Sequence, residues 1–279
     1  MRVIEASVLR NTVKRLCMKA SRDLPRAVED RIRFCRTEET WPPARDLLDQ
    51  IIANFELARR RGMPICQDTG MAWVFLEIGT ELYLQGDINA AVNEGVREGY
   101  REGCLRASMV GDPLKRVNTG DNTPAMITCE FVPGDRLTVT VAPKGFGSEN
   151  MSQIKMLRPS DGAGGVIDFV LSVVEEAGPN PCPPIIVGVG IGGSFDKAAL
   201  IAKKALLRTP GAGNGDPFYA NLEAELLERI NALGIGPQGF GGRTTALSVA
   251  IETLPTHIAG LPCAVNINCH VARHARECL

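Results

Sequence analysis

Three cysteines occupy positions that suit metal ligands better than core side chains. Each lies where a loop meets a regular element, beside proline or polar residues: Cys66 in MPICQDTG, Cys182 in GPNPCPPIIVG and Cys269 in NINCHVARH. Thiolates from three separate loops can hold an iron–sulfur cluster and leave one iron without a protein ligand. An open iron of that kind polarises a bound oxygen. The spacing lacks the short-range pattern of a ferredoxin, so the cluster is one hypothesis among others.

The remaining cysteines suit packing rather than chemistry. Cys17, Cys35 and Cys104 fall within helical patterns, and Cys129 and Cys263 lie in or beside β-rich runs. The nine cysteines form no C-x-x-C pair, and the chain shows no export signal. An odd number of cysteines without an export signal indicates reduced thiols rather than a disulfide framework.

Polar residues near these cysteines extend the hypothesis. Gln67 and Asp68 follow Cys66 directly and would place an amide and a carboxylate at such a site. Arg106 can clamp a carboxylate with two hydrogen bonds, and His257 lies in a loop between prolines. Each feature also has a plainer interpretation: an Asp-stabilised turn for QDTG, a surface arginine, and a hydrogen-bonded structural histidine. Local sequence leaves both interpretations open.

A basic segment lies near the end of the sequence. Arg273 stands between His270 and His274 in HVARHA, where we expect a helical or tail segment. Solvent exposure is the simplest account of these three side chains, because charged residues are mostly exposed.

A glycine-rich run offers a different chemistry. The G-x-G-x-x-G spacing is matched by Gly188, Gly190 and Gly193, directly after the apolar run from Pro184 to Val189. Such a turn lets backbone N–H groups approach a phosphate at a helix N-terminus. A dinucleotide site also needs a second strand that ends in an acidic residue about 20 residues further on. Here the helix runs into TPGAGNGDPFY, which has no strand pattern, so a nicotinamide-dependent dehydrogenase is the weaker alternative.

Hydrophobic periodicity predicts the elements that must position these residues. Helices are expected over residues 42–62, 87–107, 166–178 and 217–234, and the glycine-rich run should join a buried strand to a further helix. Strands are expected over 72–79, 125–132, 136–143, 246–252 and 264–269. The tripeptide PGD between the second and third of these strands indicates a β-hairpin. Asp87 is the expected N-cap of the second helix.

These elements indicate an α+β (mixed) fold. We expect one domain over residues 1–279, with a helical N-terminal portion over about 1–110 and a mixed sheet with flanking helices over about 111–279. The loops that carry the three candidate cysteines would then lie at strand ends.

Composition narrows the class of protein. The formal net charge is −1, which gives no electrostatic reason to expect a nucleic-acid or membrane partner. No stretch approaches the roughly 20 apolar residues that span a bilayer, and the N-terminus lacks the apolar core of a signal peptide. We therefore expect a cytoplasmic globular protein.

Five longer motifs resemble one family of enzymes. The chain is similar to the α subunit, or N-terminal region, of class I iron–sulfur fumarate hydratases and L-tartrate dehydratases. The motifs that carry the resemblance are PICQDTGMAWVFLEIG, GDNTPA, APKGFGSENMS, NPCPPIIVGVGIGGSFDKAALIAKKALLR and GIGPQGFGGRTTALSVAIETLPTHIAGLPCAVNINCHVARHA. The resemblance implies a [4Fe-4S] cluster held by Cys66, Cys182 and Cys269, with the fourth iron open to substrate.

The resemblance also implies roles for other residues. It assigns catalytic roles to Asp68 and His257, and substrate contacts to Gln67, Arg106 and Gly147. In the KGFGS loop, Gly145 is the alternative to Gly147 for the backbone contact with a small dicarboxylate substrate.

The implied activity is reversible hydration of fumarate to L-malate, with dehydration of L-tartrate to oxaloacetate as the alternative. A non-catalytic iron–sulfur scaffold is a further alternative. In single-chain relatives, a second domain supplies more arginines, a lysine and the catalytic base. This sequence ends at Leu279, so the resemblance implies a separate β subunit, an active site at the subunit interface and an α2β2 hetero-oligomer. Asp68 would then orient the partner's base, and His257 would relay a proton or contact substrate.

Overall fold

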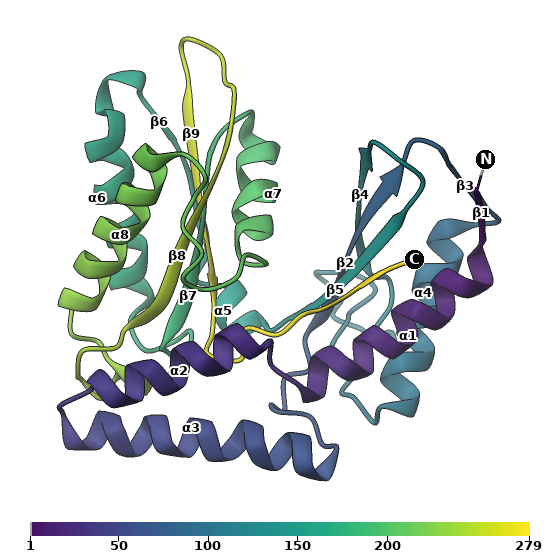
Figure 1. The fold of residues 1–279 in the computed structure, drawn as a ribbon, viewed down its shortest axis with the longest axis horizontal. Helices are drawn as coiled ribbons and strands as arrows, with labels where there is room; N and C mark the ends of the chain where they lie inside the picture. Colours follow the sequence, from purple (N-terminus) through teal and green to yellow (C-terminus); the bar gives the residue numbers. More distant parts are fainter. Residues whose placement is uncertain (1) are drawn as a thin grey trace. The chain divides into compact units, whose positions relative to one another are not determined.

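The structure is a computed structural model that describes residues 2–279 (Figure 1). The helices are α1 (Ala6–Arg22), α2 (Arg26–Glu38), α3 (Pro42–Arg61), α4 (Ile88–Glu102), α5 (Phe146–Glu149), α6 (Gly162–Ala177), α7 (Phe195–Ala205) and α8 (Pro217–Ala232). The strands are β1 (Arg2–Glu5), β2 (Met71–Gly79), β3 (Leu82–Gln85), β4 (Met126–Val132), β5 (Leu137–Lys144), β6 (Gln153–Leu157), β7 (Ile185–Gly192), β8 (Ala246–Leu254), β9 (Leu261–Asn268) and β10 (Ala275–Cys278). This arrangement confirms the α+β fold class.

The long helices follow the sequence periodicity closely. The helices predicted over 42–62, 87–107, 166–178 and 217–234 are present as α3, α4, α6 and α8. Helix α4 begins after Asp87, whose carboxylate accepts a hydrogen bond from the Ala90 N–H at 2.9 Å, as expected for an N-cap. Among residues 2–279, no helix combines the length and apolar character that crossing a bilayer requires.

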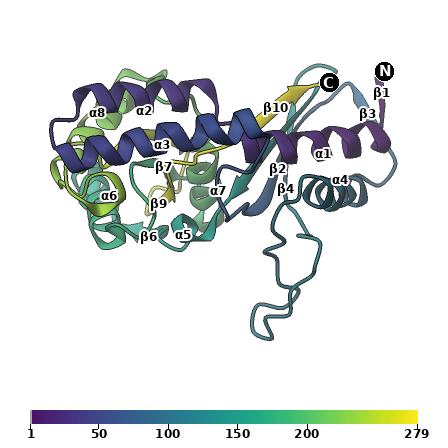
Figure 2. The same cartoon turned by 90° about the horizontal axis from the view of Figure 1, so that it is seen from below.

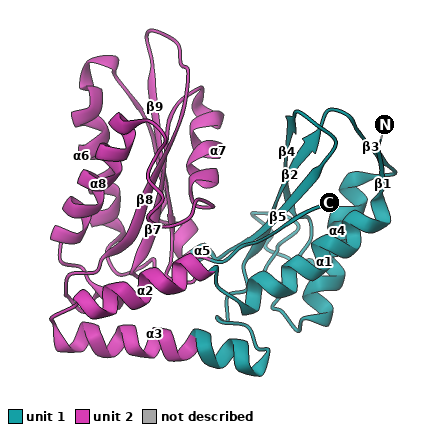
Figure 3. Cartoon of the chain, in the orientation of Figure 1, with its two compact units in different colours: residues 1–25, 55–146, 273–279 teal, residues 26–54, 147–272 magenta. Residues whose placement is uncertain are grey.

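The chain forms two compact units, each built from segments that are distant in sequence (Figure 3). Unit 1 comprises residues 1–25, 55–146 and 273–279, and unit 2 comprises residues 26–54 and 147–272. This division differs from the expected boundary near residue 110, because β2 from the first third of the chain pairs with strands from the middle third.

Unit 1 holds a four-stranded sheet in the order β10-β5-β2-β4, together with a small parallel pair of β1 and β3. Helices α1 and α4 pack on each other, and α1 also packs on β5. The prediction of a hairpin between residues 125–132 and 136–143 is wrong, because β2 lies between β4 and β5. The connection wraps round the end of β2 instead: the Gly79 N–H donates to the Arg136 carbonyl at 2.9 Å, and Glu81 N–H donates to the Gly134 carbonyl at 2.9 Å.

The end of the sequence is part of this sheet. Strand β10 pairs antiparallel with β5, with Ala275 opposite Val141 and Cys278 opposite Thr138. The expectation of a helical or solvent-exposed tail is therefore wrong. A four-residue strand is too short for its own hydrophobic pattern to be recognised, and only its pairing with β5 defines it.

Unit 2 holds a second four-stranded sheet in the order β6-β9-β7-β8. Helices α6 and α8 cover one face and α7 covers the other (Figure 1). The core between the sheet and α6 and α8 contains buried side chains such as Val170, Leu226 and Ile267. The face of the sheet under α7 is packed through small side chains, those of Ala198, Ala202 and Ala264.

The first two glycines of the motif, Gly188 and Gly190, lie inside strand β7, and only Gly193 lies in the turn that follows it. A Cβ atom on Gly188 would lie 2.2 Å from the Ala202 carbonyl oxygen, and one on Gly190 would lie 2.1 Å from the Ala198 carbonyl oxygen. Both glycines therefore let α7 approach the sheet closely. Because the first two glycines of the motif are sealed between a strand and a helix, the dinucleotide-binding alternative is wrong.

Candidate functional site

The CQDTG turn in unit 1 leads directly into β2 and is fixed by buried side chains. The Tyr100 hydroxyl donates to the carbonyl oxygen of Thr69 at 2.9 Å, or to that of Gly70 at 3.0 Å. The Asn122 amide also donates to the Gly70 carbonyl, at 3.1 Å. Burial raises the pKa of Tyr100 far above its ordinary value, so its hydroxyl remains a donor. The turn that carries Cys66 is thus held on its inner side by neutral donors.

Asp68 closes the same turn. Its Oδ1 accepts from the Gly70 N–H at 3.0 Å, and its Oδ2 accepts from the Phe146 N–H at 3.1 Å. A Cβ atom on Gly145 would lie 3.0 Å from that Oδ2, so a glycine at 145 leaves room for the carboxylate. The plainer interpretation of QDTG, an Asp-stabilised turn, is what these contacts show. Action of Asp68 on a substrate stays a prediction.

Arg106 is exposed and lies beside this turn. Its carbonyl oxygen accepts from the Thr69 hydroxyl at 3.0 Å. Two residues later, the Ser108 N–H donates to the buried Asn122 side chain at 2.7 Å. Unit 1 therefore brings Cys66, Gln67, Asp68 and Arg106 together, and Gln67 and Arg106 are both open to solvent.

Arg273 is a residue that sequence reasoning missed. It is only 4% exposed, and its Nη2 donates to the Asp68 carbonyl oxygen. Its Nε and Nη1 are also buried and find no hydrogen-bond partner among residues 2–279. A buried guanidinium with two unpaired donors is costly unless an anion or acceptor completes it. The expectation of an exposed Arg273 is wrong, because the pairing of β10 with β5 places Arg273 against the turn that carries Cys66.

Cys182 and Cys269 lie at one end of the unit 2 sheet. Cys182 comes three residues before β7, and Cys269 directly follows β9. Because these strands are antiparallel, with Ile186 opposite Asn268, the start of one meets the end of the other. His270 confirms the adjacency: its Nδ1 lies 2.9 Å from the Cys182 carbonyl oxygen.

His257 lies at the other end of the same sheet. It is exposed in the connection between β8 and β9, and its Nδ1 accepts from the Ala259 N–H at 3.2 Å. Strand β9 runs from that connection to Cys269 and covers about 23 Å at 3.3 Å per residue. Unit 2 therefore separates His257 from Cys182 and Cys269.

Gly147 lies in the short helix α5 and is exposed. A Cβ atom there would lie 3.8 Å from the Asn180 carbonyl oxygen, an ordinary contact. Neighbouring atoms therefore do not require a glycine at position 147, whereas Asp68 does limit position 145. A backbone contact between Gly147 and a substrate stays a prediction.

The nine cysteines differ in accessibility. Burial raises the pKa of Cys17 and of Cys263 to about 12, which keeps both thiols protonated. Cys182 is exposed, and Cys66 and Cys269 are partly exposed. Cys17 and Cys263 are buried, in agreement with the expectation that packing explains them.

The donor set fits an iron–sulfur cluster on two observations. The three candidate cysteines all retain access to solvent, as ligands of an added group require, and the unpaired donors of Arg273 lie at the Cys66 turn. Thiolate-bound clusters carry negative charge, which a nearby guanidinium offsets. Within residues 2–279, no three Cys, His, Asp or Glu side chains lie close enough together to bind a metal ion. Cys66 belongs to unit 1, whereas Cys182 and Cys269 belong to unit 2.

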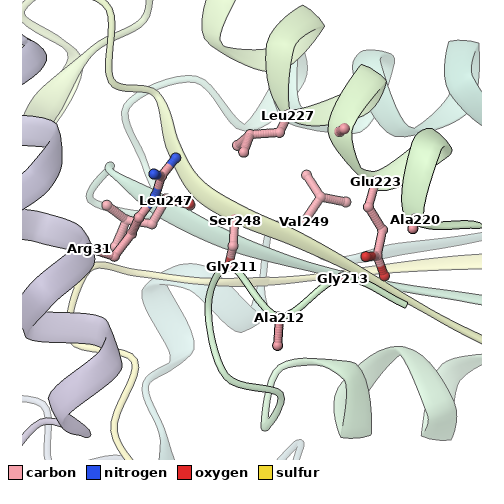
Figure 4. Close-up of a pocket in the computed structure, with 11 residues that line it drawn as sticks. Arg31, Gly211, Ala212, Gly213, Ala220, Glu223, Leu227, Leu247, Ser248 and Val249 are labelled. Atoms are coloured by element: carbon pink, nitrogen blue, oxygen red, sulfur yellow. Dashed lines mark hydrogen bonds between the residues drawn. The ribbon is translucent and has the colours of Figure 1, made fainter. Parts of the chain in front are cut away.

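A pocket in unit 2 lies apart from these cysteines, between α8, β8, α2 and the loop around Gly211 (Figure 4). Its volume is about 240 Å³. Its two charged side chains are already engaged: Arg31 donates to the Leu247 carbonyl, and Glu223 pairs with Arg208 and accepts from the Ile251 N–H. These groups stabilise the fold, and the pocket has no cluster of reactive side chains.

Comparison with known proteins gives a consistent result. A family model described as "Fumarate hydratase (Fumerase)" matches residues 10–277. The "Putative L(+)-tartrate dehydratase subunit alpha" of Methanocaldococcus jannaschii is 43% identical over 273 residues, which cover 95% of each chain. An "L(+)-tartrate dehydratase subunit alpha" of Escherichia coli is 33% identical over 254 residues, covering 90% of this chain and 84% of its relative.

Proposed function

This chain belongs to the fumarate hydratase (Fumerase) family of iron–sulfur hydro-lyases, and from that membership we propose that it is the α subunit of an L-tartrate dehydratase. The observation that carries the substrate choice is the name of its two relatives, since both are named as L(+)-tartrate dehydratase α subunits, one of them as putative. This reverses the expectation of fumarate as the first substrate. Hydration of fumarate to L-malate is the second candidate, favoured by the description of the family model.

The proposed ligands of a [4Fe-4S] cluster are Cys66, Cys182 and Cys269. When bound, the cluster would supply an open iron that acts as a Lewis acid on a substrate hydroxyl. The two strand ends that meet at Cys182 and Cys269 support a pair of ligands from unit 2. The turn held by Tyr100 and Asn122 supports a fixed position for Cys66.

Arg106 would bind one carboxylate of the dicarboxylate. Its exposed guanidinium suits a ligand that must enter and leave, and an arginine fork matches a carboxylate geometrically. Gln67 next to Cys66 would donate to the same ligand, and the backbone at Gly147 is the proposed further contact. Asp68 keeps the turn closed through its two backbone hydrogen bonds and would orient the proton acceptor.

The reaction removes a proton from one carbon of tartrate and a hydroxyl group from the next, giving the enol of oxaloacetate and water. A base must hold that proton, and we propose that it comes from a separate β subunit, since the relatives are named as α subunits. We propose an α2β2 assembly on the same ground. His257 would relay a proton in a site whose cysteines come from another chain. The reason is that, within unit 2, His257 lies far from Cys182 and Cys269 of the same chain.

The test is anaerobic reconstitution of the chain with the product of the neighbouring reading frame, followed by assay on L-tartrate, L-malate and fumarate. We expect a brown protein that is most active on L-tartrate. Cys182→Ser should lower kcat by more than the roughly 10–100-fold that loss of a supporting outer residue causes. Cys278→Ser is the matched control, because Cys278 is exposed on β10 and lies outside the proposed ligand set.

Two outcomes would contradict the proposal. Full iron content and activity in Cys182→Ser would remove that residue from the ligand set. A higher kcat/KM on fumarate than on L-tartrate would make the second candidate the correct substrate.

A further inference from the structure

A buried ion pair lies between α7 and β9 in unit 2. The Lys203 ammonium lies 2.5 Å from Oε1 of Glu149 and 3.4 Å from Oδ1 of Asn266. The Asn266 amide nitrogen donates to Oε2 of Glu149 at 3.0 Å and to the Ser152 hydroxyl at 2.9 Å. The side chains of Lys203 and Glu149 are only 10% and 20% exposed. These four residues, Lys203, Glu149, Asn266 and Ser152, form a polar network that we call the Lys203 network.

The close approach of α7 to the sheet places Lys203 in this network. Gly188 and Gly190 bring the α7 backbone against β7, and Ala202 lies directly over Gly188. Lys203 is the next residue along the helix, so its side chain starts near the sheet and reaches β9. Burial without a partner would disfavour the charged amine, and Glu149 supplies the opposite charge.

The network joins two segments that carry proposed site residues. Glu149 is the last residue of α5, which also contains Gly147. Asn266 is on β9 three residues before Cys269, and the next backbone N–H, that of Ile267, donates to the Ser152 hydroxyl at 3.1 Å. One lysine is therefore linked through direct hydrogen bonds to the Gly147 turn and to the strand that ends at Cys269.

We propose that Lys203 is a positioning residue, which holds the Gly147 turn against the β9 strand so that Gly147 and Cys269 keep fixed relative places. The proposal rests on the proposed function for the roles of those two residues. Stability alone does not explain the network well, since buried ion pairs are often replaced by apolar residues without loss of stability. A fixed turn matters more, because misplaced binding groups lower reaction rates steeply.

The experiment uses the full chain together with its partner subunit and four variants. Lys203→Met removes the ammonium group that pairs with Glu149, Lys203→Arg keeps the charge, and Lys203→Met combined with Glu149→Leu makes the pair apolar. Lys197→Met is the matched control, because Lys197 is exposed on the same helix. The readouts are amide hydrogen exchange over residues 146–152 and 265–269, thermal unfolding, and the separate values of KM and kcat for L-tartrate.

We expect hydrogen exchange in both segments of Lys203→Met to be at least about 10-fold faster than in the wild type, and KM to rise about 10-fold with a smaller change in kcat. Lys203→Arg should recover part of both effects. The apolar double variant should recover thermal stability and yet keep the fast exchange and raised KM, a combination that a merely structural role would not produce. Lys197→Met should match the wild type.

Wild-type exchange over both segments in Lys203→Met would overturn the proposal. Recovery of KM together with stability in the double variant would also overturn it. Exchange is measured without cluster or substrate, so it decides the positioning role even if the wild-type complex proves inactive on all three acids. Inactivity on all three acids would contradict the proposed function and would leave the exchange test of Lys203 unaffected.

Discussion

At Gly188 and Gly190, a hydrogen in place of a side chain determines how closely helix α7 can pack on strand β7. The backbone carbonyls of Ala202 and Ala198 stand so close to β7 that a Cβ atom on either glycine would overlap them. The same spacing in sequence is typical of a nucleotide loop. At this scale, residue type alone did not distinguish a turn that approaches a ligand from a strand that approaches a helix.

We predict that Gly190→Ala destabilises the protein strongly. The added methyl group would lie 2.1 Å from a backbone oxygen, so α7 must move, at a cost of about 3 kcal/mol or more. The matched control is Gly164→Ala in α6, where no atom lies within 4 Å of the added Cβ. That change should stabilise by about 0.5–1 kcal/mol through helix propensity.

The free energy of unfolding in urea measures both variants. Equal midpoints for Gly190→Ala and wild type would contradict the close packing of α7 on the sheet.

Arg273 is a second residue whose environment its type did not predict. A charged residue between two histidines was expected at the surface, and it is instead 4% exposed beneath the Cys66 turn. Nothing in the local pattern of HVARHA distinguishes the two cases. The burial follows from β10 pairing with β5, which is a contact between residues more than 100 positions apart.

Among the elements, the loop between α4 and β4 carries Arg106 and extends away from the unit 1 sheet (Figure 2). Asp121 holds the part of this loop that leads back to β4. One oxygen accepts from Nε of Arg97 at 2.8 Å, and the other accepts from the Thr123 N–H at 3.0 Å and hydroxyl at 2.7 Å. Burial alone would raise the pKa of Asp121, but these hydrogen bonds outweigh it and lower the pKa to about 2.

We predict that Asp121→Asn removes a stabilising contribution that depends on pH. The folded pKa lies below the unfolded value, so the contribution is present above about pH 4 and is lost as pH falls toward 2. Because the side chain is 29% exposed, solvent screening limits the effect to about 1 kcal/mol. Urea midpoints of wild type and variant should differ at pH 6, and the difference should shrink below pH 4 and disappear as pH approaches 2. A difference that stays constant with pH would contradict this assignment.

At the scale of the whole molecule, proposed site residues are distributed over both units. Cys66, Gln67, Asp68 and Arg106 belong to unit 1, and Cys182, Cys269, His257 and Gly147 belong to unit 2. Each unit has its own sheet and its own buried core.

We predict that alkylation at pH 8 sorts the nine cysteines by their environment. The exposed Cys104, Cys182 and Cys278 should react before the partly exposed Cys66 and Cys269. Cys17 and Cys263 should react only after unfolding, because burial blocks access and raises the pKa of each to about 12. Peptide mass spectrometry of the labelled chain gives the order.

The same measurement after iron–sulfur reconstitution tests the ligand set. Cluster loading should protect Cys66, Cys182 and Cys269 while the exposed Cys104 continues to react. Protection of any other set would contradict the proposed ligands.

The sequence by itself determined the long helices, the N-cap at Asp87, the α+β class and the family. Helical periodicity and capping are local properties, and family motifs are strings of neighbouring residues, so both can be read along the chain. It also indicated that Cys66, Cys182 and Cys269 lie at strand ends, because strands have recognisable hydrophobic limits.

Only the tertiary structure decided which strands are neighbours, and much of the site follows from that. The insertion of β2 between β4 and β5, the pairing of β10, and the separation of His257 from Cys269 are all consequences of strand order. Strand pairing depends on contacts between residues far apart in sequence, and no local pattern encodes which edge will be chosen. For the same reason, the buried Arg273 and the Lys203 network became visible only once distant segments were brought into contact.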